Sequence, residues 1–273
     1  SFPTRRSSDL LGNTAFKYLK SRRKTAVRNL EVCFPEWPAA QVQDNARRVF
    51  VDQMIGIFET LNAWYCPQWF NGRVSIEGLE HLHKAQADGA GVLLLGTHST
   101  LLDAGGYLCS RHFAMGAVYR PQNNPLLDLL IYRCRDAIYS CQIDHDDMRG
   151  LIRQLKDGQA IWYSPDQDFG LKQGVMAPFF GVPAATVTAH RRLMKISKAA
   201  AVPLYFYRSG DIRDPRYHVL LEPALDNFPS ADEAADAARV NKIIENQLRI
   251  APTQYMWFHR RFKTRPEGYD KIY

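Results

Sequence analysis

The chain has 273 residues, of which 46% are apolar, and a formal net charge of +7 at pH 7. That length suits one large α/β domain with a helical extension, and the apolar content is ample for a core. The five cysteines form no CxxC pair, which argues against a disulfide framework or a zinc knuckle and favours a reducing compartment.

The positive charge favours an anionic partner, such as a phospholipid surface, a phosphorylated substrate, an acidic carrier protein or a nucleic acid. No apolar run approaches the roughly 20 residues that span a bilayer, and no secretory signal peptide is present. The sequence also lacks a Gly-rich phosphate loop, a Gly-x-Ser-x-Gly elbow and a Rossmann fingerprint.

The first part of the chain, residues 1–72, is predicted to be a helical segment. Residues 1–10 fit no element, and we exclude them from the fold. Phe16–Leu30 is a basic helical stretch, either a solvated helix on the body of the protein or a membrane-surface helix drawn to anionic lipid. Ala39–Tyr65 is predicted to be one long helix whose apolar stripe faces the core, and the aromatic residues at its end belong to the core or to an interfacial belt.

Residues 73–273 alternate between strand and helix patterns, which indicates an α/β domain. Gly170–Val187 is rich in glycine and proline and is predicted to be a loop. The expected strands are Val74–Ile76, Gly91–Thr97, Gly116–Arg120, Ala160–Tyr163, Val202–Tyr207 and His218–Leu221. The expected helices are Leu79–Ala87, the one that carries Asp103, Pro125–Arg135, Met148–Lys156, Thr188–Ala199 and Ala231–Ile250.

The stretch around His98 is the strongest candidate for a site. Val92–Leu95 suits a buried parallel strand, and His98 follows the turn that ends it. Asp103 lies five positions later, about 140° around a continuous helix, so the two side chains meet only if His98 precedes the helix. A carboxylate in reach would make His98 a competent general base. A histidine near a helix start is more often a cap or a surface residue, and the spacing alone names no reaction.

Arg120 ends the next strand and is expected at the same sheet edge as His98. A guanidinium there can hold a phosphate or carboxylate by two parallel bonds, although a surface ion pair explains it equally. Arg133 and Arg135 close the following helix, where cations complement the helix dipole in any case.

Asp166 and Asp168 follow another strand and precede Gly170, a pattern that indicates a site or a tight turn. A metal site would add Asp144, His145, Asp146 and Asp147, but that loop is more typical of a solvated turn, and we expect no metal.

The C-terminal stretch Gln254–Gly268 interleaves aromatic residues with four cations at Arg260, Arg261, Lys263 and Arg265. Such a mixture is typical of a nucleic-acid or membrane interface. Packing of the aromatics on the core would explain Trp257 and Phe262 but not so many cations.

Taken together, these stretches resemble the late acyltransferases of lipid A biosynthesis, most closely the lauroyl-transferring branch, over about residues 17–270. The residues that carry the resemblance are Arg28–Glu36, Gly96–His98 with Asp103, Val118–Pro121 with Asn124–Leu126, Trp162–Asp166 with Asp168 and Gly170, and Gln254–Gly268. The first and last stretches are long and specific to the family, so they weigh more than the histidine–aspartate pair.

The resemblance implies a glycerolipid-acyltransferase-like fold, with a mixed, mostly parallel central sheet flanked by helices and an N-terminal helical extension. It implies transfer of a fatty acyl group, lauroyl-like in this branch, from acyl carrier protein to a hydroxyl of an anionic, Kdo-bearing lipid A precursor at the cytoplasmic face of the inner membrane. It implies neither a cofactor nor a nucleic-acid partner.

The resemblance also assigns residues to the site. The catalytic set is His98, Asp103, Arg135 and Asp166, and the substrate-binding set is Arg120, Asp168 and Gly170. His98 would act as the base, oriented by Asp103. We further expect Asp166 to pair with an arginine, within about 4 Å, beside His98.

Two features depart from the family pattern. Many members carry Glu at the position of Asp103, and either carboxylate can orient a histidine. The family usually begins with an N-terminal hydrophobic anchor, in whose place this chain carries residues 1–10, and we interpret this as a truncated start.

Three other hypotheses fit parts of the sequence. The chain could be an acyltransferase for another glycolipid or a lysophospholipid. It could be a metal-dependent hydrolase that uses His98, Asp103, His145 and Asp166. It could also be a basic membrane- or nucleic-acid-binding protein without catalysis.

Overall fold

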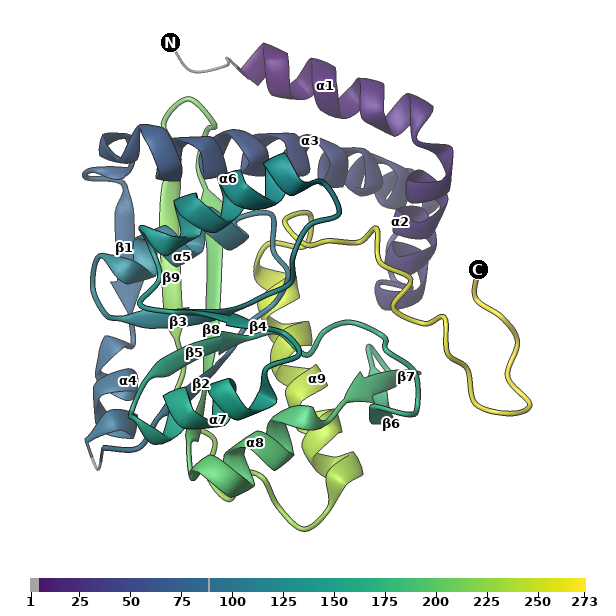
Figure 1. Cartoon of the computed structure of the whole chain (residues 1–273). Helices are drawn as coiled ribbons and strands as arrows, with labels where there is room; N and C mark the ends of the chain where they lie inside the picture. The colour runs from purple at the N-terminus through teal and green to yellow at the C-terminus, as the bar shows by residue number, and fades with distance from the viewer. Residues whose placement is uncertain (1–4, 88) are drawn as a thin grey trace.

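The computed structural model of the chain describes residues 5–87 and 89–273, and within them a seven-stranded sheet is flanked by helices (Figure 1). The predicted α/β class, with a mostly parallel sheet and an N-terminal helical region, is confirmed. The helices are α1 (Arg5–Tyr18), α2 (Lys20–Cys33), α3 (Ala39–Tyr65), the 3-10 turn η1 (Pro67–Phe70), α4 (Leu79–Gln86), α5 (Leu102–Ser110), α6 (Pro125–Asp136), α7 (Met148–Lys156), α8 (Ala189–Ser197) and α9 (Glu233–Ile250). The strands are β1 (Val74–Glu77), β2 (Val92–Leu95), β3 (Met115–Tyr119), β4 (Gln142–Asp144), β5 (Ala160–Tyr163), β6 (Gly174–Phe179), β7 (Val182–Val187), β8 (Ala200–Ser209) and β9 (Arg216–Leu221).

The strand order of the sheet is β1-β9-β8-β2-β5-β3-β4, and every neighbouring pair is parallel except β8 and β9. The middle strand, β2, is buried at all four positions. Its last residue, Leu95, pairs with Tyr163 of β5 and with Pro203 of β8. The carboxyl ends of β2 and β5 therefore lie side by side, where ligand sites of open α/β sheets are found.

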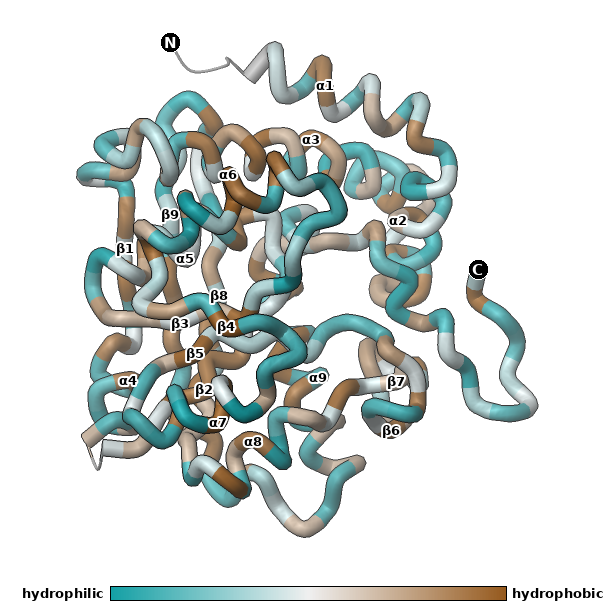
Figure 2. The backbone as a smooth tube through the Cα atoms, in the orientation of Figure 1, coloured by the Kyte–Doolittle hydropathy of each residue, from teal (hydrophilic) through white to brown (hydrophobic). Residues whose placement is uncertain are grey.

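Side chains of β2 alternate between two apolar clusters, one on each face of the sheet. Leu93 and Leu95 join a cluster that includes residues of α2, α3, α9 and the C-terminal segment, residues 251–273. Val92 and Leu94 join a second cluster with residues of α5, β3 and β9. The tube coloured by hydropathy shows this apolar interior along the strands (Figure 2). Because both faces of β2 are covered, the loop that follows it is held on a rigid base.

The long helix α3 confirms the predicted boundaries, but its buried stripe differs from the prediction in the second half. Val42, Ala46 and Val49 are buried as expected. Ile57 and Leu61, also expected in the core, are 45% and 40% exposed. The buried face there carries polar side chains instead, because α3 binds an arginine of the sheet.

The N-terminal region differs from the prediction in two ways. Arg5–Leu10 do form an element, since they begin α1, which lies along α3, while residues 1–4 lie outside the described residues. The expected helix Phe16–Leu30 is divided at Leu19 between α1 and α2. None of the helices in the described part of the chain is long and apolar enough to cross a membrane.

Gly170–Val187, predicted to be a loop, contains the antiparallel hairpin of β6 and β7. Phe180 and Gly181 form its turn with φ angles of 49° and 75°, which is the combination of a type I′ turn. The hairpin packs on α9, where the Asn241 side-chain amide donates to the carbonyl oxygen of Pro178 at 2.9 Å. The short strand β4 was also not predicted.

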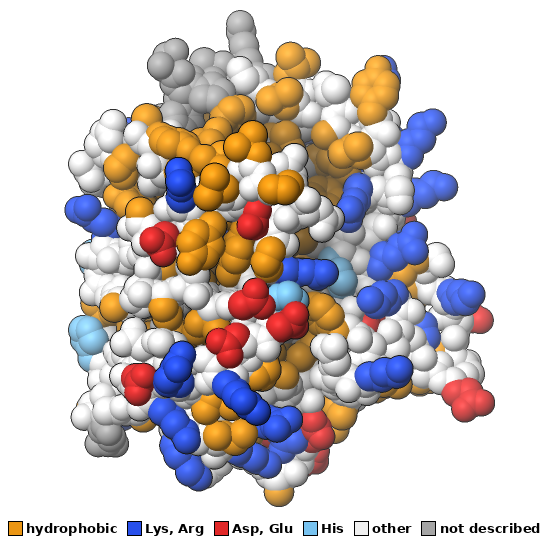
Figure 3. All heavy atoms as spheres, in the orientation of Figure 1, with side chains coloured by type: hydrophobic (Ala, Val, Ile, Leu, Met, Phe, Trp, Pro, Cys, Tyr) orange, Lys and Arg blue, Asp and Glu red, His pale blue; other side chains and the backbone are white. Residues whose placement is uncertain are grey.

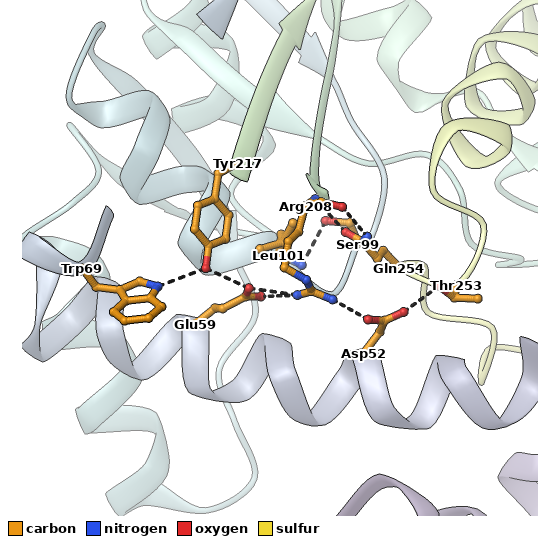
Figure 4. A network of polar contacts seen from close by, with 9 residues as sticks. All are labelled: Asp52, Glu59, Trp69, Ser99, Leu101, Arg208, Tyr217, Thr253 and Gln254. Atoms are coloured by element: carbon orange, nitrogen blue, oxygen red, sulfur yellow. Dashed lines mark hydrogen bonds and ion pairs between the residues drawn. The ribbon is translucent and has the colours of Figure 1, made fainter. Parts of the chain in front are cut away.

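A buried ionic network joins α3 to the sheet and to the C-terminal segment (Figure 4). The Arg208 guanidinium at the end of β8 donates to both carboxylate oxygens of Glu59, at 2.9 and 2.8 Å, and also pairs with Asp52. The Tyr217 hydroxyl donates to Glu59, and the Thr253 hydroxyl donates to Asp52. One cation therefore holds two carboxylates of α3 against the sheet.

Removal of this cation should destabilise the fold. The side chains of Arg208 and Glu59 are only 6% and 2% exposed, so Arg208→Met would leave a carboxylate buried without its counter-charge. We expect the free energy of unfolding, measured with urea, to fall by about 3–5 kcal/mol. The control is Arg216→Met, whose pair with Asp214 is exposed and should cost about 0–1 kcal/mol. Equal losses in the two variants would contradict the role assigned to the network.

Candidate active site

His98 and Asp166 form the centre of the site, at the carboxyl edge of the sheet. Nδ1 of His98 lies 2.6 Å from Oδ1 of Asp166, and the backbone N–H of His98 donates to Oδ2 at 2.9 Å. His98 follows β2 and Asp166 follows β5, which are adjacent parallel strands. The Asp166 carboxylate thus bonds both the ring and the backbone N–H of His98, and these two bonds fix the orientation of the ring.

Asp166 is completely buried, and its own contacts are equally specific. The Ser164 hydroxyl lies 2.8 Å from Oδ1 of Asp166 and 3.0 Å from the carbonyl oxygen of Gly96. The Tyr255 hydroxyl donates to the backbone carbonyl oxygen of Asp166 at 3.3 Å. A buried carboxylate needs such partners to stay charged.

The contact between His98 and Asp166 shifts the pKa of both side chains. Burial lowers the pKa of His98, but the charge of Asp166 and the hydrogen bond to it outweigh burial, so the pKa lies above its usual value. Burial raises the pKa of Asp166, but the charge of His98 and the hydrogen bonds from His98 and Ser164 bring it well below its usual value. Near neutral pH, Asp166 is therefore a carboxylate that favours the imidazolium form of His98.

Gly96, in the turn before His98, has no room for a side chain. A Cβ atom on Gly96 would lie 2.3 Å from Nε1 of Trp162, so only glycine fits at this position. The Trp162 ring meets the His98 ring edge to face, with ring centroids 5.7 Å apart. The Trp162 ring therefore covers one side of the His98 imidazole.

The C-terminal segment bonds the backbone of the loop that carries His98. The backbone N–H of Met256 donates to the carbonyl oxygen of His98 at 3.0 Å, and the N–H of Thr100 donates to the carbonyl oxygen of Gln254. The Gln254 side chain in turn bonds the backbone N–H and carbonyl of Arg208. The loop with His98 is therefore connected through the C-terminal segment to the buried ionic network on α3.

Asp103 and Arg135 pair with each other, which corrects two predictions. Nε and Nη2 of Arg135 donate to the two carboxylate oxygens of Asp103, at 2.6 and 3.1 Å. Asp103 therefore does not supply the carboxylate that bonds the His98 ring at Nδ1, because Asp166 does. The expected ion pair of Asp166 with an arginine is also wrong, since in the described chain the Asp166 side chain bonds His98 and Ser164 and pairs with no arginine.

The Asp103–Arg135 pair joins α5 to α6, a helix without a buried residue. Near the start of α6, the Tyr119 hydroxyl of β3 donates a hydrogen bond to the Asp128 carboxylate. The Arg135 guanidinium also lies over the Tyr119 ring, 5.6 Å from its centroid. Polar contacts thus hold α6 on this edge of the sheet, and they replace the apolar packing that most helices use.

Asp168 and Gly170 close the loop after β5. Asp168 is buried, and its carboxylate accepts from the Gly170 N–H and from the backbone N–H and hydroxyl of Thr264, at 2.8–2.9 Å. The backbone N–H of Asp168 donates to Nε2 of His259. These bonds join the loop to the C-terminal segment, and the predicted substrate-binding role of Asp168 and Gly170 stays a prediction.

Arg120 directly follows β3 at the same sheet edge and is exposed, as an anion-binding residue would be. Its role also stays a prediction. Asp144, His145 and Asp146 are exposed and lie close enough to share a cation, and Asp147 caps α7. Within the described residues, His98, Asp103, His145 and Asp166 do not form a metal-ligand group, so the hydrolase hypothesis loses its site.

The four C-terminal cations divide into two kinds. Arg261 is buried and bonds Ala185, Thr186 and Asn241, while Arg265 donates to the carbonyl oxygen of Pro183. These two arginines hold the hairpin and α9 in place, so internal bonds explain two of the four cations that suggested an interface. Arg260 and Lys263 are exposed.

Sequence analysis missed several residues that support the site, namely Ser164, Tyr255 and His259. All three lie inside motifs that it had singled out, but neither their spacing nor their residue type indicated contact with Asp166 or Asp168. Burial lowers the pKa of His259, so near neutral pH it is a neutral acceptor for the Asp168 N–H.

This arrangement is suited to general-base chemistry. Because Nδ1 of His98 is held by a carboxylate, Nε2 carries the lone pair in the neutral ring and can accept a proton. The His98 side chain is 23% exposed, so an external hydroxyl can reach it.

Comparison with known proteins adds a family to this geometry. A family model for bacterial lipid A biosynthesis acyltransferases matches residues 2–264. A lipid A biosynthesis lauroyltransferase of Escherichia coli K12 is 38% identical over 96% of this chain and 86% of its own length. A lipid A biosynthesis palmitoleoyltransferase of the same organism is 36% identical over the same shares. A lipid A biosynthesis acyltransferase of Haemophilus influenzae is 38% identical over 92% of this chain and 82% of its own length.

The coupling of His98 to Asp166 can be measured directly. Asp166→Asn removes the charge that raises the pKa of the His98 ring but leaves burial in place, so that pKa should fall below its wild-type value. NMR titration of the ring resonances reports it. Asp168→Asn, a change two residues away that does not touch His98, should leave the pKa unchanged. An unchanged His98 pKa in a folded Asp166→Asn protein would contradict the pairing.

Proposed function

This chain belongs to the bacterial lipid A biosynthesis acyltransferases, and from that premise we propose that it moves a fatty acyl chain from acyl carrier protein to a hydroxyl of a Kdo-bearing lipid A precursor. His98 is the general base of this proposal. The observation that carries it is the bond of Nδ1 of His98 to the buried Asp166, at the edge of the sheet where open α/β folds bind ligands.

In the proposed reaction, Nε2 of His98 takes the proton of the acceptor hydroxyl, and the oxygen attacks the thioester carbonyl carbon of the donor. The tetrahedral intermediate then expels the donor thiolate, which takes the proton from His98. Asp166 stabilises the imidazolium between these two steps and keeps the ring in place, as the carboxylate of a catalytic triad does.

Direct transfer fits the surroundings of His98. Its ring bonds Asp166, and within the described residues no serine or cysteine is hydrogen-bonded to it. Ser164 lies near, but its hydroxyl is within bonding distance of Asp166 and Gly96. A covalent acyl-enzyme is therefore not part of the proposal.

The oxyanion of the intermediate needs donors. The candidate donors are a backbone N–H near Gly96 and Thr97 or an arginine. The Gly96 N–H is already bonded to the carbonyl oxygen of Tyr163. Arg135 uses Nε and Nη2 on Asp103, which leaves Nη1 for a substrate anion or the oxyanion, and we assign this role to it.

We place the enzyme at the cytoplasmic face of the inner membrane. Hydrophobic side chains gather over α6 and the adjoining α3 (Figure 3), and the Tyr65 hydroxyl of α3 lies 3.6 Å from Sγ of Cys134 on α6. Co-sedimentation with vesicles that contain phosphatidylglycerol tests this contact, and a chain left in the supernatant would contradict it. The exposed apolar residues of the two helices are Ile57, Leu61, Tyr65, Leu126, Leu127, Leu129, Leu130 and Tyr132.

The acyl group is proposed to be lauroyl-like, although relatives named for lauroyl and palmitoleoyl groups are nearly equally similar to this chain. The alternative acceptors are another glycolipid or a lysophospholipid. Product masses from parallel incubations decide both points.

The decisive assay offers several acyl-carrier donors to the protein with a Kdo-bearing tetraacyl lipid A precursor, another glycolipid or a lysophospholipid. We expect a product one acyl chain heavier with the lipid A precursor alone, most rapidly with the lauroyl donor. His98→Ala should lower turnover by about 10²–10⁴ because the base is lost. Turnover near wild type in a folded His98→Ala protein, or product from the lysophospholipid alone, would overturn the proposal.

A further inference from the structure

A basic trough lies between α2 and the C-terminal segment. Its larger part has a volume of about 820 Å³ and is lined by residues of α2 and by Arg260, Ile272 and Tyr273. Its smaller part, about 320 Å³, is lined by Phe258, His259 and Lys263 among others. The two parts share Ser21, Thr25 and Arg260, so they lie next to each other, and we treat them together as the trough.

The charged residues of the lining are positive with one exception. Glu31 is the one acidic lining residue that the described chain contributes, and it pairs with Arg28. Figure 3 shows lysine and arginine side chains gathered over α2 and the C-terminal segment. The lining cations are Lys20, Arg22, Arg23, Lys24, Arg28, Arg260 and Lys263.

Several of these cations are available to a ligand. Within the described residues, no hydrogen bond or ion pair engages the ammonium groups of Lys20, Lys24 and Lys263, which are exposed. Arginine and lysine in such a setting bind phosphate, arginine by two parallel bonds and lysine as a point charge.

Hydrogen bonds connect α2 and the C-terminal side of the trough to the loop that carries His98. The Asn29 side chain of α2 donates to the carbonyl oxygens of Trp257 and His259, both at 2.8 Å. Met256, only two residues before Phe258 of the lining, bonds the backbone of His98. Two residues of chain span at most about 7 Å, so the lining at Phe258 adjoins the backbone that bonds the loop with His98. His259, which also lines the trough, accepts the backbone N–H of Asp168, two residues after Asp166.

We propose that this trough holds the phosphate groups of the acceptor glycolipid while its hydroxyl reaches His98. The inference rests on the proposed function and adds a subsite to it. A trough of this size suits a sugar-phosphate headgroup, whereas a carrier protein would need a contact of about 800 Å² on each partner. The ligand is thus recognised by its charge on α2, while the reacting hydroxyl is recognised at the sheet edge.

Two double variants of equal charge change test the subsite. Lys20→Glu with Lys24→Glu reverses charge in the trough, and Arg192→Glu with Lys195→Glu does the same on exposed positions of α8. The probe is a soluble disaccharide with two phosphate monoesters, and its unphosphorylated form is the reference. By calorimetry, the trough variant should bind the phosphorylated probe about tenfold or more weakly, and the α8 variant should bind it as wild type does.

Kinetics separate the other sources of negative charge. The trough variant should raise KM for the phosphorylated acceptor, with little change in kcat or in KM for the acyl-carrier donor. A rise confined to the donor's KM would assign the trough to the carrier protein and overturn the inference. Loss of binding to phosphatidylethanolamine–phosphatidylglycerol vesicles with unchanged probe affinity would assign it to the bilayer and also overturn it. If the wild type binds the probe in the trough but transfers no acyl chain, the proposed function fails while the anion site stands.

Discussion

The bond between His98 and Asp166 is the constraint around which the rest of the molecule is arranged. It joins the ends of the two most central parallel strands and buries a full negative charge at their edge. A buried carboxylate is stable only with a counter-charge and further donors, and Ser164 together with the His98 backbone supplies them. The same bond leaves Nε2 of the neutral His98 ring as a proton acceptor, so the interaction that satisfies the buried charge also suits the proposed role of His98 as the base.

Two further polar systems keep this pair in place. The Arg208 network fixes α3 and the C-terminal segment (Figure 4). That segment bonds the backbone of His98 through Met256. The Asp103–Arg135 pair fixes α6, whose apolar residues stay exposed. Polar contacts thus position both the loop that carries His98 and α6, and the apolar residues of α6 stay exposed. This division of roles explains why so many charged residues of this protein are buried or half-buried.

Much of the fold was predictable, because β2, β5, α3 and α7 carry apolar patterns that depend on local sequence alone. The hairpin of β6 and β7 was missed because its glycine and proline residues are typical of loops, and its packing on α9 is a tertiary effect. For the candidate site, sequence analysis singled out His98, Asp103, Arg135 and Asp166 but paired them wrongly. Sequence analysis joined His98 to Asp103, five residues away, whereas the bonded partner is Asp166, 68 residues away. Asp103 instead meets Arg135, 32 residues away, and only the sheet order brings either pair together.

The central claim is that Asp166 sets the protonation of a catalytic His98, and the pH dependence of kcat/KM tests it most directly. Because the base must be neutral and its pKa is raised, kcat/KM of the wild type should rise with pH through a midpoint above the usual pKa of histidine. In Asp166→Asn the midpoint should move to lower pH, and the plateau should fall because the imidazolium loses its carboxylate. A profile that is flat across the neutral range, or a midpoint that the substitution does not move, would contradict the account.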